Sequence, residues 1–472
     1  MTAADPAYES IASLSSRLRK GQTSPVEITG QLLERLGKLD GKLHAFIHPM
    51  PEHALARARA ATRALKNGSA GPLSGIPYAA KDLFDVAGTP TTAGTRLLAN
   101  NVKKADSTVV AKLGAAGMVL LGKTHTVQFA YGASGINNDH GTPHNPWHKV
   151  AHVPGGSSSG SAVAVASGLV PFALGTDTGG SVRVPAALCG IVGLKTTVGR
   201  VSRAGVYPLC WTLDSVGPIT RTVEDAALVF QAMQGEDPED ASTLGIAPIG
   251  TLRTLKKGAQ GLRVAFAETA FFDDLDPEVE AAVREAGRVF ASLGAKVTSL
   301  EVPEAAAAWA EKNRGLLIPA EACVWNGEFL DQHLAELDPV IGPRMLTGRN
   351  LSAPDYFLLL KRYAGLRRQL ETTLAHVDVL LTPTTMVPAR PVAEVQARYM
   401  DFNWKYHRNA GIGNILDLCG VSLPCGFSKD GLPIGLQVYA RPFREDLALR
   451  AAYAYEQATD WHERRPDLQR LA

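Results

Sequence analysis

Residues 153–196 read VPGGSSSGSAVAVASGLVPFALGTDTGGSVRVPAALCGIVGLKT. This stretch contains two segments rich in Gly and Ser, at 154–161 and 175–185. Small residues over 159–167 predict a closely packed helix, and the apolar run 170–174 predicts a buried strand. A helix and a strand joined by Gly-rich turns are typical of a helix-covered sheet with a functional site on its loops.

The same alternation of strands and helices extends upstream of this stretch. Short apolar runs at 76–80 and 118–121 predict strands, and 107–116 predicts a helix between them. Residues 24–27 (SPVE) place a cap, an N1 proline and an N3 glutamate in order, which predicts the start of a helix, and 51–66 predicts a second one. The sequence therefore predicts an α/β fold with a mixed β-sheet core covered by helices on both faces.

We expect a single large domain spanning 1–472, because no internal repeat or flexible linker interrupts the chain. Within it, a helical N-terminal layer (1–70) precedes the Gly/Ser-rich core (71–230). A variable α/β insert (231–375) follows, and the remaining residues, 376–472, return to the core. In and just after the insert, strands are predicted at 262–266, 296–302 and 378–382, and helices at 277–293, 304–316 and 354–375.

Composition narrows the class of protein. Of the 472 residues, 45% are hydrophobic and 20% charged, which excludes a disordered or fibrous chain. The 48 basic and 46 acidic side chains give a net charge of +2, so no basic excess points to nucleic acid. The uncharged stretch 151–176 is broken by prolines and glycines and does not predict a membrane span. Five scattered cysteines without a CxxC pair, and no secretory signal, indicate a cytoplasmic protein.

Two motifs suggest a nucleotide site and a metal site, but the residues within each motif argue against that site. Residues 117–124 (GMVLLGKT) match the phosphate-loop pattern GxxxxGK[ST], but the four middle residues are themselves a buried strand rather than a loop. Histidines recur every fourth residue from His140 to His152, but Gly141 and intervening prolines prevent the helix that would align them on a metal. A serine hydrolase of the Ser-His-Asp type stays a weak alternative, since no GxSxG elbow is present.

The chemistry that the Gly/Ser segments favour is acyl transfer. A serine hydroxyl needs a base to become a nucleophile, and a buried lysine can be that base when it is neutral. Lys81 lies at the end of a predicted strand. The turn Thr178-Gly179-Gly180-Ser181 can aim successive backbone N–H groups at a carbonyl oxygen, as an oxyanion hole requires.

Residues 153–196 closely resemble the signature of the amidase signature family, whose members use a Ser–Ser–Lys triad. The flanking residues agree with this resemblance, at 73–77 (LSGIP), Lys81-Asp82, 145–147 (NPW) and 432–437 (LPIGLQ). The resemblance implies the family's mixed-sheet α/β fold and an amidohydrolase that forms a seryl acyl-enzyme. It implies no metal and no organic cofactor.

Carried over by position, the resemblance implies a catalytic triad of Ser181 as nucleophile, Ser157 as bridging serine on a cis peptide, and Lys81 as general base. The separation of the two serines, 181 − 157 = 24, is the family's usual spacing. It further implies an oxyanion hole made by the N–H groups of Thr178, Gly179, Gly180 and Ser181, and a supporting or substrate-binding set made of Ser134, Ser158, Asp177 and Arg183.

Two departures from the family pattern are visible. Ser159 replaces a glycine at an expected helix start, where serine is tolerated. The stretch 131–144 (YGASGINNDHGTPH) lacks the GSSTEN pattern of the A subunits of tRNA-dependent amidotransferases.

We therefore expect a C–N hydrolase that acts on a small-molecule amide, anilide or carbamate (urethane), as a monomer or homodimer without nucleic-acid or membrane partners. The alternatives are an amidotransferase A subunit with glutaminase activity and, from another class, a nucleotide-binding protein. Aromatic residues of the insert and of 399–407 either shape a pocket for an aromatic or extended apolar substrate group or fill the core, as aromatic residues commonly do: Trp309, Trp325, Tyr356, Phe357 and Trp404.

Overall fold

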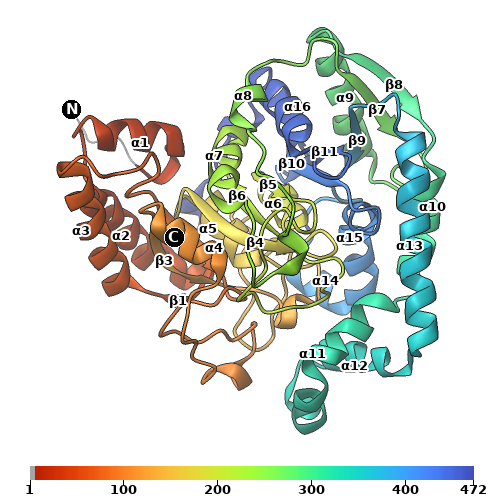
Figure 1. Cartoon of the computed structure of the whole chain (residues 1–472), viewed down its shortest axis with the longest axis horizontal. Helices are drawn as coiled ribbons and strands as arrows, with labels where there is room; N and C mark the ends of the chain where they lie inside the picture. Colours follow the sequence, from red (N-terminus) through yellow and green to blue (C-terminus); the bar gives the residue numbers. More distant parts are fainter. Residues whose placement is uncertain (1–5, 472) are drawn as a thin grey trace.

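One mixed sheet runs through the computed structural model, which describes residues 6–471 (Figure 1). Its eleven strands lie in the order β1-β3-β2-β4-β6-β5-β10-β11-β9-β7-β8. The predicted α/β class with a mixed sheet is confirmed. The strands are β1 (Phe46–Pro49), β2 (Pro77–Lys81), β3 (Val119–Thr124), β4 (Phe172–Asp177), β5 (Val192–Lys195), β6 (Ser215–Thr220), β7 (Arg263–Ala267), β8 (Lys296–Leu300), β9 (Val379–Pro383), β10 (Cys419–Phe427) and β11 (Pro433–Ala440).

Parallel pairing is confined to two parts of the sheet. β2 runs parallel to β3 and β4, and β7 runs parallel to β8 and β9, while the other neighbours are antiparallel. Every residue of β2, β3 and β4 is buried. Strands covered on both faces consist of continuous apolar or small residues, which explains why these segments lack a polar alternation.

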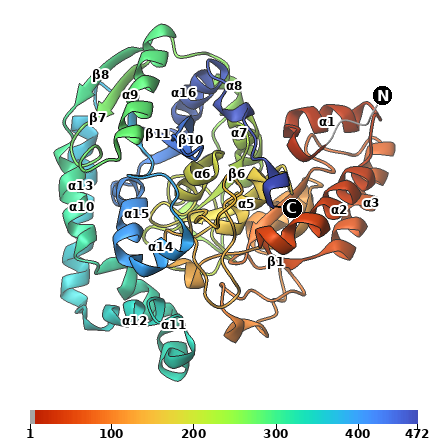
Figure 2. The same cartoon turned by 180° about the vertical axis from the view of Figure 1, so that it is seen from behind.

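The helices pack on this sheet and extend past both of its ends. In both views α1, α2 and α3 lie at one end of the molecule, and α10 to α13 lie at the other (Figures 1 and 2). The α-helices are α1 (Ile11–Arg19), α2 (Pro25–Leu43), α3 (Pro51–Lys66), α4 (Thr108–Ala115), α5 (Ser159–Ala166), α6 (Arg183–Cys189), α7 (Val223–Met233), α8 (Leu252–Leu255), α9 (Pro277–Ser292), α10 (Pro303–Asn313), α11 (Leu317–His333), α12 (Ile341–Leu346), α13 (Ala353–Thr373), α14 (Val392–Ala397), α15 (Tyr399–Ile415) and α16 (Glu445–Gln457).

The N-terminal helices begin where their local sequence signals predict. The Ser24 side chain accepts a hydrogen bond from the Glu27 N–H at 3.2 Å, and the Glu27 carboxylate accepts one from the Ser24 N–H at 2.8 Å. This is the reciprocal capping box that residues 24–27 predict. The helix predicted over 51–66 is α3, and the one predicted over 277–293 is α9.

Residues 231–375, expected as a variable insert, contribute strands to the main sheet. β7 and β8 extend the sheet beyond β9 at the predicted positions. The helix predicted over 304–316 ends at Asn313, because Gly315 follows with a φ of +63°. Helix α11 comes directly after it, and the sequence patterns do not predict it.

The phosphate-loop match is a strand, as its apolar middle suggests. β3 occupies Val119–Thr124 and is buried throughout. The Lys123 ammonium, which a nucleotide would need, is fully buried and forms an ion pair with Asp82 at 2.6 Å. This segment therefore presents no phosphate cradle, and the nucleotide-binding alternative loses its basis.

The structure offers no site for a metal and no membrane span in the part of the chain that it describes. No three of the His, Cys, Asp and Glu side chains among residues 6–471 gather in a way that could hold a metal ion. Likewise, none of the described helices is both long enough and apolar enough to cross a bilayer.

Candidate active site

Lys81 is the last residue of β2, and its side chain is completely buried. Its Nζ donates hydrogen bonds to the Ser157 Oγ and to the Thr176 Oγ1, each at 2.7 Å. Thr176 lies on β4, the parallel neighbour of β2, so the sheet itself brings the lysine and the threonine together. Two of the three predicted catalytic residues are thus in direct contact.

The surroundings of Lys81 favour its neutral form. Burial lowers the pKa of Lys81 to about 7, and attraction to the Asp214 and Asp177 carboxylates opposes this shift. Near pH 7 about half of the lysine is therefore uncharged, which a general base requires.

Ser157 is held in a turn that only glycines could form. The Gly156–Ser157 peptide is cis, as the resemblance implies. Gly155 has a φ of +79°, and a Cβ there would lie 2.8 Å from the Pro185 Cα. A side chain at Gly155 would push this turn away from α6.

A backbone hydrogen bond links the residue after Ser157 to Ser181. The Ser158 N–H donates to the Ser181 carbonyl at 3.2 Å. Within the described part of the chain, no hydrogen bond joins the hydroxyls of Ser157 and Ser181. Hydrogen bonds of this type often tighten only when substrate binds. Ser181 is 8% exposed and lines a cavity, so its hydroxyl has access to a ligand.

The turn that precedes α6 is organised by the Asp177 carboxylate. Asp177 accepts hydrogen bonds from the N–H groups of Gly180 at 2.9 Å and Val182 at 3.1 Å. The Gly180 N–H is therefore already occupied, in contrast to its predicted place in the oxyanion hole. The N–H groups of Thr178, Gly179 and Ser181 have no acceptor among the described residues, and these three line the cavity. They are the available donors for an oxyanion.

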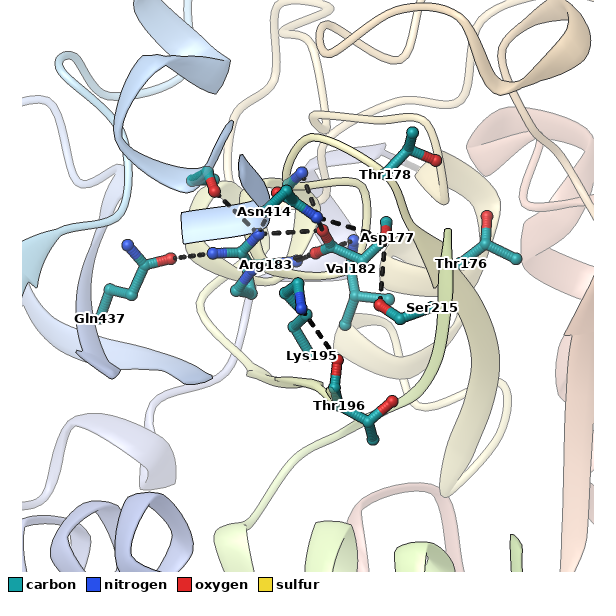
Figure 3. A network of polar contacts seen from close by, with 12 residues as sticks. Thr176, Asp177, Thr178, Val182, Arg183, Lys195, Thr196, Ser215, Asn414 and Gln437 are labelled. Carbon is teal, nitrogen blue, oxygen red and sulfur yellow. Dashed lines mark hydrogen bonds and ion pairs between the residues drawn. The ribbon is translucent and has the colours of Figure 1, made fainter. Parts of the chain in front are cut away.

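Arg183 fixes the other side of Asp177 (Figure 3). Its guanidinium donates to both Asp177 carboxylate oxygens, at 2.9 and 3.0 Å, and both side chains are fully buried. Burial alone would raise the pKa of Asp177, but the attraction to Arg183 holds it well below its usual range. The remaining guanidinium donors bind Gln437 at 2.8 Å and Asn414 at 2.7 Å.

Replacing Arg183 by Met should destabilise the fold, because Asp177 would keep a buried charge without its partner. We expect a loss of about 3–5 kcal/mol in the free energy of unfolding, measured by urea denaturation. Arg284→Met is the control, since its ion pair with Glu268 is partly exposed and should contribute no more than about 1 kcal/mol. Equal losses in the two variants would contradict the role given to Arg183.

The other predicted supporting residues lie behind the cavity. The Ser158 Oγ donates to the Thr176 carbonyl at 3.4 Å. Ser134 is fully buried and does not line the cavity, although residues 130–133 just before it do. Its carbonyl accepts from the Gly155 N–H at 3.1 Å, so Ser134 supports the turn that carries Ser157.

The cavity next to Ser181 has a volume of about 370 Å³ and is lined mainly by residues of helices α10, α11, α12 and α15 and by residues 130–133. Of the aromatic residues expected to shape it, only Trp404 lines it, and Trp309 packs edge-to-face on Trp404 at 5.3 Å. Trp325 and Phe357 are instead 51% and 66% exposed.

Sequence reasoning missed two residues that complete the site. Thr176 lies inside the quoted signature, but nothing in the sequence marks it as a partner of Lys81. Asp214 accepts a hydrogen bond from the Thr178 hydroxyl, and burial raises the pKa of Asp214 to about 6. Its sequence surroundings, Thr212-Leu213-Asp214-Ser215, carry no signal that would have identified it.

Comparison with known proteins adds an independent observation. A family model described as Amidase matches residues 27–449. The chain belongs to the amidase signature family. In Chloroflexus aggregans, the A subunit of glutamyl-tRNA(Gln) amidotransferase is 37% identical to this amidase over 492 residues, covering 98% of this chain and 99% of that protein.

Solved structures of this family show the same fold. Native peptide amidase from Stenotrophomonas maltophilia is 31% identical to this amidase, with a TM-score of 0.87 and coverage of 98% of both chains. A 6-aminohexanoate cyclic dimer hydrolase solved with its substrate is 26% identical, with a TM-score of 0.89 over 98% of this chain and 99% of that one. The chain is thus a hydrolase of this family that acts on C–N bonds. Over nearly its whole length it is similar to enzymes that are named for different substrates.

Proposed function

We propose that this amidase cleaves the C–N bond of a small-molecule amide, anilide or carbamate through an acyl-enzyme on Ser181. The observation that carries the proposal is the 2.7 Å contact between the Lys81 Nζ and the Ser157 Oγ, in a fully buried setting. A neutral lysine that touches a hydroxyl can accept its proton, and that hydroxyl can in turn take the proton of a second serine.

The proposed reaction proceeds in two halves. Ser181 Oγ attacks the carbonyl carbon while its proton passes to Ser157, whose own proton passes to Lys81. The tetrahedral oxyanion accepts hydrogen bonds from free N–H groups of the 178–181 turn. When the C–N bond breaks, Lys81 returns the proton through Ser157 to the leaving nitrogen. Water then attacks the acyl-enzyme, loses a proton through the same relay, and Ser181 regains its hydrogen as the acid leaves.

The rate should rise with pH through the neutral range. The neutral form of Lys81 is the active one, so kcat/KM should fall about tenfold for each pH unit below 7 and level off above about pH 8. Asp214→Asn removes a negative charge that holds the pKa of Lys81 up, so it should move the acidic limb to lower pH. A profile that is flat from pH 5 to 9, or a shift to higher pH in that variant, would speak against Lys81 as the base.

A substrate screen tests the proposed reaction directly. Aryl amides, short aliphatic amides and carbamates should be incubated with the enzyme and, as the blank, with Ser181→Ala. We expect release of amine from at least one class with the unsubstituted enzyme only. Equal release by the two proteins, or none from any class, would count against the proposal.

A second candidate is the glutaminase component of a tRNA-dependent amidotransferase. The observation that favours it is the 37% identity to such an A subunit over nearly the full length of both chains. Against it, 131–144 lacks the pattern of those subunits. Glutaminase activity together with a co-purifying partner protein would favour this candidate over a free-standing hydrolase.

We further propose that the enzyme works as a monomer or homodimer on a small molecule, without nucleic acid or membrane. A cytoplasmic location is part of the same proposal, and the five cysteines, all free and buried, suit a reducing compartment. Size-exclusion chromatography with light scattering tests the oligomeric state.

A further inference from the structure

A second cavity lies where residues near both ends of the chain meet. It has a volume of about 340 Å³, and it shares no lining residue with the cavity beside Ser181. Its wall includes residues from three distant parts of the chain: Tyr8, Arg221 directly after β6, and Arg464 and Arg465 after α16. The proposed reaction uses none of these side chains.

Guanidinium groups surround the Tyr8 ring. The Arg465 Cζ lies 4.6 Å from the ring centroid, and the Arg221 Cζ lies 5.7 Å from it. Arg35 of α2 lies behind the cavity wall, with its Cζ at 5.2 Å, and donates to the Tyr8 hydroxyl at 3.2 Å. An aromatic ring attracts one cation by about 0.5–2 kcal/mol, so a single ring does not replace the counter-ions of three.

The cavity wall carries more positive than negative charge. Glu463 is its one carboxylate among the described residues, against the three arginines Arg221, Arg464 and Arg465, so the wall has a net charge of +2. His462 also lines the cavity, but burial lowers its pKa, so it is neutral at pH 7. Within residues 6–471, no carboxylate forms an ion pair with any of the three guanidinium groups.

Most of the guanidinium donors in this wall have no acceptor. A guanidinium carries five N–H donors. Arg221 is 8% exposed and donates to the Val170 carbonyl at 3.4 Å and to the Glu9 carbonyl, which leaves three donors without a described acceptor. The side chains of Arg464 and Arg465 contact aromatic rings and donate no hydrogen bond to any residue that the structure describes.

Arg221 keeps its charge in this position. Burial lowers its pKa to about 10, with Arg465 and Arg35 acting in the same direction and Asp225 and Tyr8 against it. This value is still well above 7, so the guanidinium stays protonated. A buried charge without a counter-ion is costly, and proteins normally pair it. The cavity is therefore best satisfied by a bound anion.

A phosphate monoester matches this wall in charge and in donor geometry. It carries about −1.5 to −2 charges at pH 7 and has three acceptor oxygens. Guanidinium groups bind such oxygens in pairs. A carboxylate, with a single charge, would leave part of the positive charge unmatched. The volume leaves room for an organic group as well, since pockets for small molecules begin at about 300 Å³.

The organic group of such a ligand can extend along Trp147. This indole lines both the cavity and an open hollow next to it. Phe427 and Trp461 line the hollow too, and the Arg464 guanidinium stacks over these rings at 4.8 and 4.6 Å. Aromatic and guanidinium faces are the surfaces on which nucleobases stack.

We propose that the cavity between Tyr8, Arg221 and Arg465 is a binding site for a small organic phosphate. The site is separate from amide cleavage and does not depend on it. Sugar phosphates and nucleoside monophosphates share the phosphate group, and the titrations below distinguish them. A ligand there would contact both terminal segments and the core at once, so it should also stabilise the fold.

Calorimetric titration of the unsubstituted enzyme with AMP, ribose 5-phosphate and ribose tests the site. We expect both phosphates to bind and ribose not to bind. Tighter binding of AMP would place its base on the aromatic hollow, whereas equal binding of the two phosphates would assign the site to sugar phosphates. Binding of ribose as tight as that of ribose 5-phosphate, or no binding of either phosphate, would overturn the proposal.

Arginine variants locate the phosphate. Arg465→Gln should weaken the binding of ribose 5-phosphate about 10- to 100-fold, because charge-assisted hydrogen bonds are lost. Arg465 is exposed, so this variant should fold normally. Arg344→Gln is the matched control, since it removes an arginine from the wall of the cavity beside Ser181. It should leave this affinity unchanged. Weaker binding in Arg344→Gln together with unchanged binding in Arg465→Gln would place the phosphate beside Ser181 and overturn the site.

Thermal unfolding gives a second readout. A ligand that binds only the folded chain raises the Tm, so ribose 5-phosphate at about 100 times its Kd should raise the Tm of the unsubstituted enzyme. The same concentration should raise the Tm of Arg465→Gln much less. Arg221→Met extends the test to the buried arginine, with its Tm without ligand as the check on folding. An equal rise in the unsubstituted enzyme and in Arg465→Gln would contradict the proposed site.

Discussion

Ser181→Ala is expected to reduce turnover by about a million-fold, which is the loss typical of a nucleophile that works as part of a unit. The hydroxyl forms the bond to the acyl group, and no other serine takes its place among the described residues of the cavity wall. The substitution removes one oxygen from a residue 8% exposed, so the fold should remain intact. The measurement is the amine released from a substrate found in the screen, with thermal unfolding as a check on folding.

Ser159→Ala is the matched control for this variant. Ser159 belongs to the same Gly/Ser segment as Ser157, but its Oγ meets only the His125 carbonyl at 3.5 Å. Its loss should change the rate by no more than a few-fold. A fluorophosphonate, which labels activated serines, should add to the enzyme and not to Ser181→Ala. Labelling at another serine would move the nucleophile elsewhere.

Lys81→Met should cost nearly as much activity as the loss of the nucleophile. Methionine keeps the length and burial of the side chain but cannot accept the Ser157 proton. Members of such a unit are strongly non-additive, so the double variant Lys81→Met/Ser181→Ala should be no slower than either single variant. Single-turnover assays with the most reactive ester or anilide measure these residual rates.

Lys81→Arg tests whether Lys81 acts as a base or only through its positive charge. An arginine side chain stays protonated in proteins, so it keeps the charge and donates hydrogen bonds but cannot take a proton at neutral pH. We expect this variant to be as inactive as Lys81→Met. Activity within tenfold of the original enzyme would show that the lysine acts by its charge alone.

The candidate site can be proposed from the sequence because its parts lie in short, locally determined segments. Gly-rich turns and a strand end position Lys81, Ser157 and Ser181, and these signals are visible within a few residues of each. The structure places Lys81 and Ser157 in contact and Ser181 on the cavity wall. The occupied Gly180 N–H cannot be foreseen, since it depends on which way the Asp177 carboxylate turns.

The cavity wall cannot be predicted from the sequence for a different reason. Lys312, Arg344 and Tyr131 lie on separate elements, and only long-range packing brings them together. Helix α15 is not predicted from the sequence because Gly411 and Gly413 have low helix propensity. In addition, its second half is buried on every side, so its apolar residues do not form a stripe on one face. Both glycines are needed for packing: a Cβ at Gly413 would lie 2.1 Å from the Tyr439 hydroxyl.

The continuation of one sheet through β7 and β8 has a consequence for how such enzymes diversify. Helices α10 to α13 all lie between β8 and β9 in the chain. One continuous segment, attached to the sheet at both of its ends, therefore forms much of the cavity wall. Mutations in these helices can change selectivity while the contacts of Lys81 with Ser157 and Thr176, anchored on β2 and β4 in another part of the sheet, keep their geometry. New specificities can therefore arise through substitutions in these helices and the turns between them, without changes in the part of the sheet that carries Lys81 and Thr176.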